Sequence, residues 1–228
     1  KNATEGLNLI AASFPFKKTK NEVVLTLSEH HSNLLPFYEQ GKRRGFSIKL
    51  MPINKDGTLD LRLLNRAITK KTALVSVSHL SNVTGLVYPI KEIAQIAHSK
   101  GAKILVDDAQ FVANHKEDVR ANKTDFLVFS GHKIGAPTGI GVLYAKEQLL
   151  KSLLPYNVGG GTVQTVKVSQ NRISVKYLSV PFRFEAGIQD YLGIVGLKAA
   201  IDFLQKQGMK RIANYIEGLV YYAWQQMS

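Results

Sequence analysis

The chain has 228 residues, of which 45% are hydrophobic and 21% charged, the composition of an ordinary globular protein. It contains no cysteine, so these residues hold no disulfide, no thiolate metal site and no cysteine nucleophile. The net charge is +13, but the basic residues are scattered, which favours a solvated surface over a nucleic-acid-binding face. No apolar run reaches the roughly 18 residues that span a bilayer, and no secretory signal opens the chain, so we expect no membrane partner and a cytoplasmic location.

Short apolar runs alternate with amphipathic stretches along most of the chain. We expect a first helix over residues 7 to 14, with Thr4 as its cap and Glu5 in its first turn. Strands are then predicted at 23–27, 48–53, 73–77, 103–106, 126–129 and 140–144, and helices at 34–42, 59–68 and 89–99. This alternation predicts an α/β fold whose mostly parallel sheet is flanked by helices.

The last third of the chain has a less regular pattern. Gly159–Gly161, with Thr162 and Thr165, predicts a long irregular excursion, and helices are expected at 188–207 and 211–224. We interpret residues 1–207 as a large domain and residues 208–228 as a helical connection toward a small C-terminal domain. Because the chain has no initiator methionine and enters a helical pattern at once, we expect it to be a segment of a longer protein.

Polar side chains follow the predicted strands at their carboxyl ends, where open α/β sheets bind their ligands. Ser130, His132 and Lys133 follow the strand at 126–129, and Asp107 follows the strand at 103–106. Pyridoxal phosphate (PLP) requires a lysine for its Schiff base, an anionic partner for its pyridine nitrogen and donors for its phosphate. The sequence therefore indicates a PLP site centred on Lys133 and Asp107.

Other strand-end residues fit the ring of this cofactor. His30 could stack on the ring or move a proton, while Asn82 and Gln110 could hydrogen-bond its hydroxyl group. Asp108 is a rival to Asp107, but alternation along a strand places the two side chains on opposite faces. Each of these residues, taken alone, also fits a cap or a turn.

Donors for the phosphate are expected from two segments. Thr4 and Gly6 lie at the N-terminus of the first helix, which offers backbone N–H groups and a favourable dipole. Ser130 and His132 stand two residues apart, next to Lys133, and can both face one phosphate. We assign no metal ligands from the sequence.

Together these motifs resemble the class V aminotransferase-fold PLP enzymes, and specifically the SUF-type (group II) cysteine desulfurases and selenocysteine lyases. The paired His30 and His31, with Pro36 after them, favour the SUF-type branch. The matching segments follow the family order over nearly the whole chain: Thr4–Asn8, Glu29–Asn33, Asn54–Leu59, Ser81–Gly85, Val106–Gln110, Ser130–Lys133, Pro137–Gly141, Gly159–Gly161 and Arg183–Gly187.

The resemblance implies a large domain like that of aspartate aminotransferase and a function in iron–sulfur cluster assembly. Such enzymes take sulfur from L-cysteine, leaving L-alanine and an enzyme persulfide, as homodimers that pass sulfur to a SufE-like carrier or a scaffold protein. By resemblance, Lys133 and His30 are the catalytic residues, and Lys133 carries the cofactor. The same resemblance assigns cofactor contacts to Thr4, Glu5, His30, Asn82, Asp107, Gln110, Ser130, His132 and Lys133.

Three departures from the family pattern stand out. The family's persulfide cysteine and its substrate-binding arginine belong to a later part that we expect this segment to lack. Ile188 replaces a threonine that reaches the phosphate of the neighbouring subunit's cofactor, and Asp108 replaces a common glycine. Two alternatives therefore stay open: another class V enzyme, such as a selenocysteine lyase, aminotransferase or epimerase, or a non-catalytic basic binding module.

Overall fold

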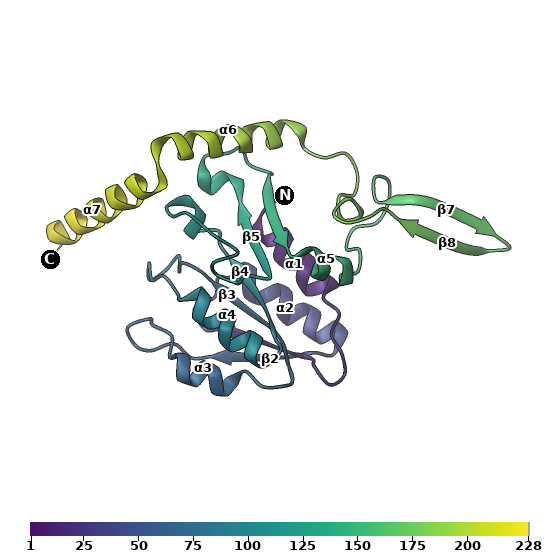
Figure 1. The fold of residues 1–228 in the computed structure, drawn as a ribbon, viewed down its shortest axis with the longest axis horizontal. Helices are drawn as coiled ribbons and strands as arrows, with labels where there is room; N and C mark the ends of the chain where they lie inside the picture. Colours follow the sequence, from purple (N-terminus) through teal and green to yellow (C-terminus); the bar gives the residue numbers. More distant parts are fainter. Residues whose placement is uncertain (228) are drawn as a thin grey trace.

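A six-stranded sheet forms the centre of the computed structural model, which describes residues 1–227 (Figure 1). Its strand order is β2-β1-β3-β4-β5-β6. All neighbouring strands are parallel except β5 and β6, which are antiparallel. The strands are β1 (Glu22–Thr26), β2 (Ser47–Met51), β3 (Thr72–Ser78), β4 (Lys103–Asp107), β5 (Phe126–Ser130) and β6 (Gly141–Ala145). The predicted α/β fold with a mostly parallel sheet is confirmed.

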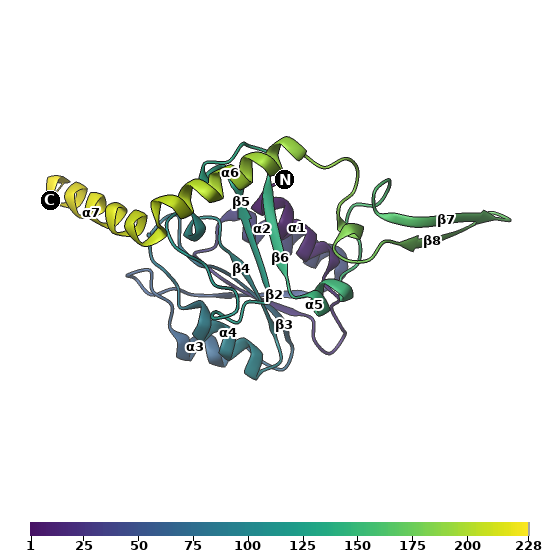
Figure 2. The ribbon, with the colours of Figure 1, turned by 45° about the horizontal axis from the view of Figure 1, so that its top comes forward.

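Helices cover both faces of this sheet (Figures 1 and 2). On one face, α1 (Ala3–Ser13) and α2 (His31–Arg44) pack over inward residues such as Leu25 and Leu105. On the other face, α3 (Leu61–Ala67) and α4 (Ile90–Ser99) pack over Val24, Ile104 and Val106. Since successive strand residues point to opposite faces, one continuous apolar run supplies both cores.

The first helix begins earlier than predicted and has a different cap. It starts at Ala3, and the side chain of Asn2 accepts a hydrogen bond from Glu5 N at 2.9 Å. Thr4 therefore lies inside the first turn, and the expectation that it caps the helix is wrong. Asparagine at this position satisfies an otherwise unpaired N–H group as well as threonine would.

A two-stranded hairpin occupies much of the predicted irregular excursion. Strands β7 (Val163–Ser169) and β8 (Arg172–Tyr177) pair antiparallel and project away from the sheet (Figure 1). Gln170 and Asn171 join them with φ angles of 46° and 62°, the backbone of a tight hairpin turn. Val166 and Val168 pair with Val175 and Ile173 and alternate with polar residues, so the sequence does carry the alternation typical of a strand, although both faces of the hairpin are largely exposed. The short helix α5 (Glu147–Ser152) was likewise not predicted.

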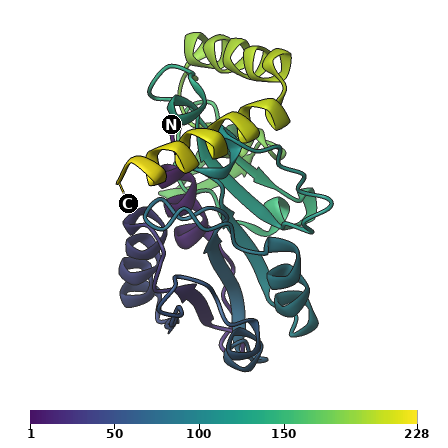
Figure 3. The same cartoon turned by 90° about the vertical axis from the view of Figure 1, so that its left-hand side faces the viewer.

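Two long helices end the described chain. Helix α6 (Tyr191–Gln207) runs past the loop after β5, where Gly196 lies against Pro137, and α7 (Met209–Met227) extends away from the sheet (Figures 2 and 3). Asp190 caps α6 through Gly193 N, and Gly208, with φ of 83°, separates α6 from α7. None of the helices within residues 1–227 is both long enough and apolar enough to cross a bilayer.

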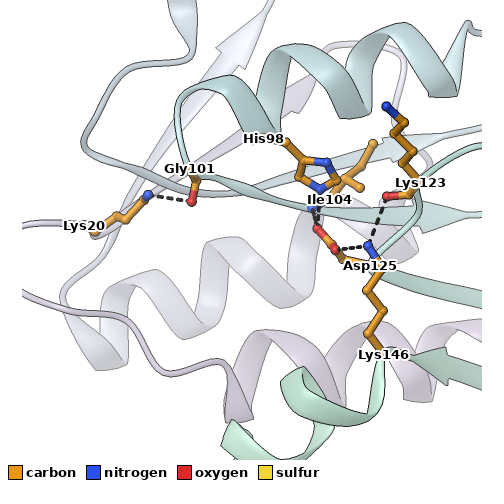
Figure 4. Close-up of polar contacts among 7 residues, drawn as sticks. All are labelled: Lys20, His98, Gly101, Ile104, Lys123, Asp125 and Lys146. Carbon is orange, nitrogen blue, oxygen red and sulfur yellow. Dashed lines mark hydrogen bonds and ion pairs between the residues drawn. The ribbon is translucent and has the colours of Figure 1, made fainter.

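A buried carboxylate ties together the amino-terminal edge of the sheet (Figure 4). Asp125, which is 2% exposed, accepts hydrogen bonds from Lys146 Nζ at 2.7 Å and Ile104 N at 3.0 Å. Its Oδ2 also lies 2.7 Å from His98 Nε2. Burial opposes ionisation, but the hydrogen bonds from Lys146 and His98 hold the pKa of Asp125 below its usual value. Nearby, Lys20 Nζ donates to the carbonyl of Gly101.

Replacing this carboxylate tests how much the edge depends on it. Asp125→Asn should lower the free energy of unfolding by about 2 kcal/mol at pH 7, because partly buried cations lose their counter-charge. Urea unfolding measures the difference, with exposed Asp202→Asn as the control. A carboxylate whose pKa is lowered on folding stabilises above its unfolded pKa, so the difference should shrink as the pH falls below about 4. Equal stability of both variants would show that Asp125 contributes nothing.

Candidate functional site

A cavity of about 270 Å³ opens at the carboxyl ends of the strands. Residues from the ends of β3, β4 and β5 and from the N-termini of α1 and α2 form its wall. The lining residues are Asn2, Ala3, Thr4, His30, Ser32, Ser78, Leu80, Asn82, Asp107, Ala109, Gln110, Ser130, His132 and Lys133.

Strand pairing brings the lysine and the aspartate into this wall. Ser78 lies opposite Asp107 in the parallel β3–β4 ladder, and Asp107 lies opposite Val128 in the β4–β5 ladder. Residues 131–134 turn directly after β5 as a short 3₁₀ helix, which carries Lys133 over the cavity. An amine and a carboxylate that are far apart in the chain thus share one small space.

Asp107 is a buried carboxylate that faces the cavity. Its side chain is 6% exposed, and Ala109 N donates to Oδ1 at 3.1 Å. Burial raises the pKa of Asp107, while the hydrogen bond from Ala109 and the positive charge of Lys133 oppose this rise. A protonated ring nitrogen brought against this carboxylate would offset its burial.

The N-terminus of α1 forms the second side of the cavity. Ala3 N donates to Ser130 Oγ at 2.9 Å, and Thr4 Oγ1 donates to Ser32 Oγ at 2.8 Å. A Cβ atom on Gly141 would lie only 2.6 Å from Asn2 Cα, so this close approach of helix and strand requires glycine. The result is a set of hydroxyl groups at a helix N-terminus, an arrangement suited to a phosphate group.

His30 is oriented by its own helix. It precedes α2, and its Nδ1 accepts a hydrogen bond from Ser32 N at 3.1 Å. The neutral ring therefore carries its proton on Nε2. His30 lines the same cavity as Lys133 and Asp107.

A buried glutamate fixes the backbone next to His30. Glu29 accepts hydrogen bonds from Thr26 Oγ1, Asn33 Nδ2 and both the N–H and the hydroxyl of Ser78, at 2.5 to 2.8 Å. These bonds join the ends of β1 and β3 to α2. Burial nevertheless dominates, and it raises the pKa of Glu29 to about 6.

The structure brings nearly all of the predicted site residues together. Glu5 is the exception: it does not line the cavity, and its carboxylate pairs with the amino group of Lys1. The residues that line the cavity as expected are Thr4, His30, Asn82, Asp107, Gln110, Ser130, His132 and Lys133.

Asp107 and Asp108 separate as strand alternation predicted. Asp108 is fully buried away from the cavity wall, where its Oδ1 lies 2.7 Å from His79 Nδ1. Burial raises the pKa of Asp108 to about 6. Sequence reasoning missed this contact, the role of Asn2 and the Glu29 network. Of these three features, only the cap of α1 had a local signal in the sequence, because Asn2 stands just before a first turn that contains an acidic residue.

Glu29 generates a prediction for the pH dependence of stability. Its pKa is raised on folding from 4.5 to about 6, so the folded state retains a proton over that range and stability falls as the pH rises through it. Glu29→Gln should remove up to about 2 kcal/mol of this fall. Urea unfolding at pH 4.5 and pH 7 measures the change. If both proteins lose the same stability between these pH values, Glu29 does not titrate as described.

Comparison with known proteins supplies an independent identification. The family model for aminotransferase class-V matches residues 1–228. Cysteine desulfurases from Escherichia coli O157:H7 (strain EC4115 / EHEC) and Enterobacter sp. (strain 638) are 41% and 42% identical over 229 and 230 residues, which cover 100% of this chain. The chain spans 56% of the length of each of these relatives.

Solved structures agree with the sequence relatives. The apo cysteine desulfurase from Thermococcus onnurineus NA1 superposes with a TM-score of 0.91 at 36% identity, covering 99% of this chain and 56% of that one. The Escherichia coli cysteine desulfurase CsdA superposes with a TM-score of 0.86 at 33% identity, covering 92% of this chain and 52% of that one. The cystine C–S lyase C-DES, solved with its reaction product cysteine persulfide, gives 0.78 at 27%, covering 91% and 55%. The chain therefore belongs to the class V aminotransferase family.

Proposed function

We propose that this chain is the cofactor-binding part of a PLP-dependent cysteine desulfurase, which converts L-cysteine to L-alanine and passes on the sulfur. The observation that carries the proposal is that Lys133 and the buried carboxylate of Asp107 line one cavity with the N-terminus of α1. Cysteine desulfurases are also the relatives that match the whole chain. Because the chain spans about half of their length, the activity of the whole protein remains a proposal.

The donor set of the cavity fits each part of PLP. Lys133 supplies the amine for the aldehyde, and Asp107 supplies the buried anion for the ring nitrogen. Asn82 and Gln110 supply amide groups for the ring hydroxyl. The hydroxyl groups and imidazole for the phosphate come from Thr4, Ser130 and His132.

The chain's own residues would divide the work between holding and proton transfer. When bound, PLP supplies an electron sink for negative charge that develops on the substrate. Asp107 would keep the ring nitrogen protonated, which strengthens that sink. The Lys133 amine would hold the cofactor and would move protons at the substrate. His30, with its proton on Nε2, would stack on the ring and supply a second proton carrier.

Sulfur acceptance needs a group that these residues do not contain. The family's thiolate nucleophile is a cysteine, and these 228 residues include none. We therefore place the persulfide outside them, with further transfer to a SufE-like carrier or a scaffold for iron–sulfur cluster assembly in the cytoplasm. The division into a large domain at 1–207 and a connection at 208–228 is part of the same proposal.

An exposed apolar surface supports a homodimer. Ile188, which precedes α6, and Tyr191 and Leu192 in its first turn are 92%, 68% and 85% exposed. Apolar side chains gathered in this way favour an interface. The family's threonine at this position reaches the phosphate of the neighbouring subunit's cofactor. Ile188 cannot donate a hydrogen bond, so such a dimer would lack that contact.

A C–S lyase is the second candidate function. The neighbour C-DES is a cystine lyase, and the absence of cysteine from these residues is compatible with cleavage that uses no protein thiol. Other class V enzymes, such as a selenocysteine lyase, aminotransferase or epimerase, would share the cavity residues described above. Product analysis with the whole protein separates these enzymes.

Cofactor binding tests the proposed role of Lys133. The chain mixed with PLP should show an absorbance band near the visible edge that borohydride abolishes, and Lys133→Ala should lack it because no amine then reaches the aldehyde. Exposed Lys198→Ala serves as the control. A Lys133→Ala protein that keeps the band would exclude this lysine. If the wild-type chain shows no band, the result favours the alternative of a non-catalytic basic binding module. That alternative further requires DNA binding whose affinity falls steeply with salt concentration.

The missing thiol generates a second prediction. With PLP and L-cysteine, these 228 residues alone should release no sulfide above the level of free PLP, because no persulfide can form on them. A methylene-blue assay measures sulfide. Release that persists after the Lys133 substitution would contradict the mechanism.

A further inference from the structure

A second cluster of polar side chains lies beside the cavity but outside its wall. His79 follows β3, Asp108 follows β4, and Glu117 lies in the loop before β5. His79 Nδ1 is 2.7 Å from Asp108 Oδ1 and 3.0 Å from Glu117 Oε2. The side chains are 6%, 0% and 10% exposed. One imidazole nitrogen thus faces two buried carboxylates.

The hydrogen atoms available do not satisfy these carboxylates. His79 Nδ1 carries at most one proton, and its hydrogen bond goes to Asp108 Oδ1. Asp108 Oδ2 and Glu117 Oε2 are both buried without a hydrogen-bond partner among the described residues. Glu117 Oε2 nonetheless points at His79 from 3.0 Å. Buried polar atoms are seldom left in this state, so the two carboxylates need a positively charged partner beyond His79.

The contact of His98 with Asp125 shows what a complete pair looks like in this fold. The His98–Asp125 distance is also 2.7 Å, but there a single carboxylate receives Lys146 Nζ and a backbone N–H as well (Figure 4). Around His79 the second group is another carboxylate instead of a lysine. An imidazolium carries one positive charge against two negative ones, so protonation of His79 cannot neutralise the cluster.

A divalent cation would neutralise the two carboxylates and would bind their unpaired oxygen atoms. Two carboxylates and a neutral imidazole balance its charge, and the three ligand atoms lie within 4.8 Å of one another. Ligand atoms around a metal with bonds of about 2.1 Å are about 3.0–3.4 Å apart, so small shifts of the side chains suffice. Asn122 Nδ2 donates to Glu117 Oε1 at 2.9 Å, which leaves Oε2 for the metal.

We propose that His79, Asp108 and Glu117 bind a divalent transition-metal ion with mixed nitrogen and oxygen ligands, of the Zn²⁺ type. This site is separate from the cavity around Lys133. Because imidazole is a poor ligand for Mg²⁺ and Ca²⁺, those ions should bind far more weakly. The ion would join the ends of β3 and β4 to the loop that carries Glu117.

Zn²⁺ titration of the 228-residue chain, prepared without an affinity tag and freed of metal by dialysis, tests the proposal. Isothermal calorimetry should show one equivalent of Zn²⁺ bound, and Zn²⁺ should raise the melting temperature, since it binds only the folded arrangement. Asp108→Asn and Glu117→Gln should each weaken binding about 100-fold or more, because even outer-shell changes cost roughly 10–100-fold. Mg²⁺ should give no such signal.

Matched controls separate this site from the other histidines. His98→Gln removes an imidazole that also contacts an aspartate, and His132→Gln removes one from the cavity; both should bind Zn²⁺ as wild type does. Circular dichroism checks that each variant folds. If Asp108→Asn does not fold, the Zn²⁺ affinity of Glu117→Gln decides the outcome. Absence of Zn²⁺ binding by wild type, or unchanged binding by folded Glu117→Gln, would overturn the proposal. Loss of binding in either control would do the same.

Discussion

The parallel pairing of β3, β4 and β5 is the constraint on which the cavity depends. Parallel strands end on the same edge, so the register that sets Ser78 opposite Asp107 also sets the following residues side by side. The backbone continues this pairing beyond the strands: His79 N donates to Asp107 O, and Asp108 N donates to Val128 O. Lys133 and Asp107 come together because their strands are neighbours.

Consecutive aspartates at the end of β4 serve two separate environments. Alternation directs Asp107 into the cavity and Asp108 to His79 on the other side. Each carboxylate is nearly or fully buried, and burial raises the pKa of both. A strand end that places two buried anions back to back needs a cation on each side. The proposed cofactor nitrogen supplies one of them, and the proposed metal ion supplies the other.

Local patterns in the sequence were sufficient to predict the sheet and most of the cavity. Apolar runs bounded by polar strand ends predict both β4 and the position of Asp107, because burial on both faces leaves a continuous apolar signature. The β7–β8 hairpin was missed although its residues alternate between apolar and polar, because the glycines before it were taken as the sign of an irregular segment. The cap of α1 was assigned two residues too late.

Contacts between distant segments were beyond local patterns. Glu117 meets His79 only because the loop after β4 folds back over the end of β3, and no spacing in the sequence encodes that return. The Glu29 network is similar: it joins β1, α2 and β3 through side chains that also read as ordinary turn residues. Burial and long-range pairing decide the chemistry of both groups.

Peptide mapping after borohydride reduction of the PLP-loaded chain tests the central claim most directly. Reduction turns the lysine–cofactor linkage into a stable bond, so mass spectrometry can locate the modified residue. If the cavity at the ends of β4 and β5 is the cofactor site, the pyridoxyl group will be found on Lys133. Its location on another lysine, or its spread over many of them, would contradict the assignment of this site.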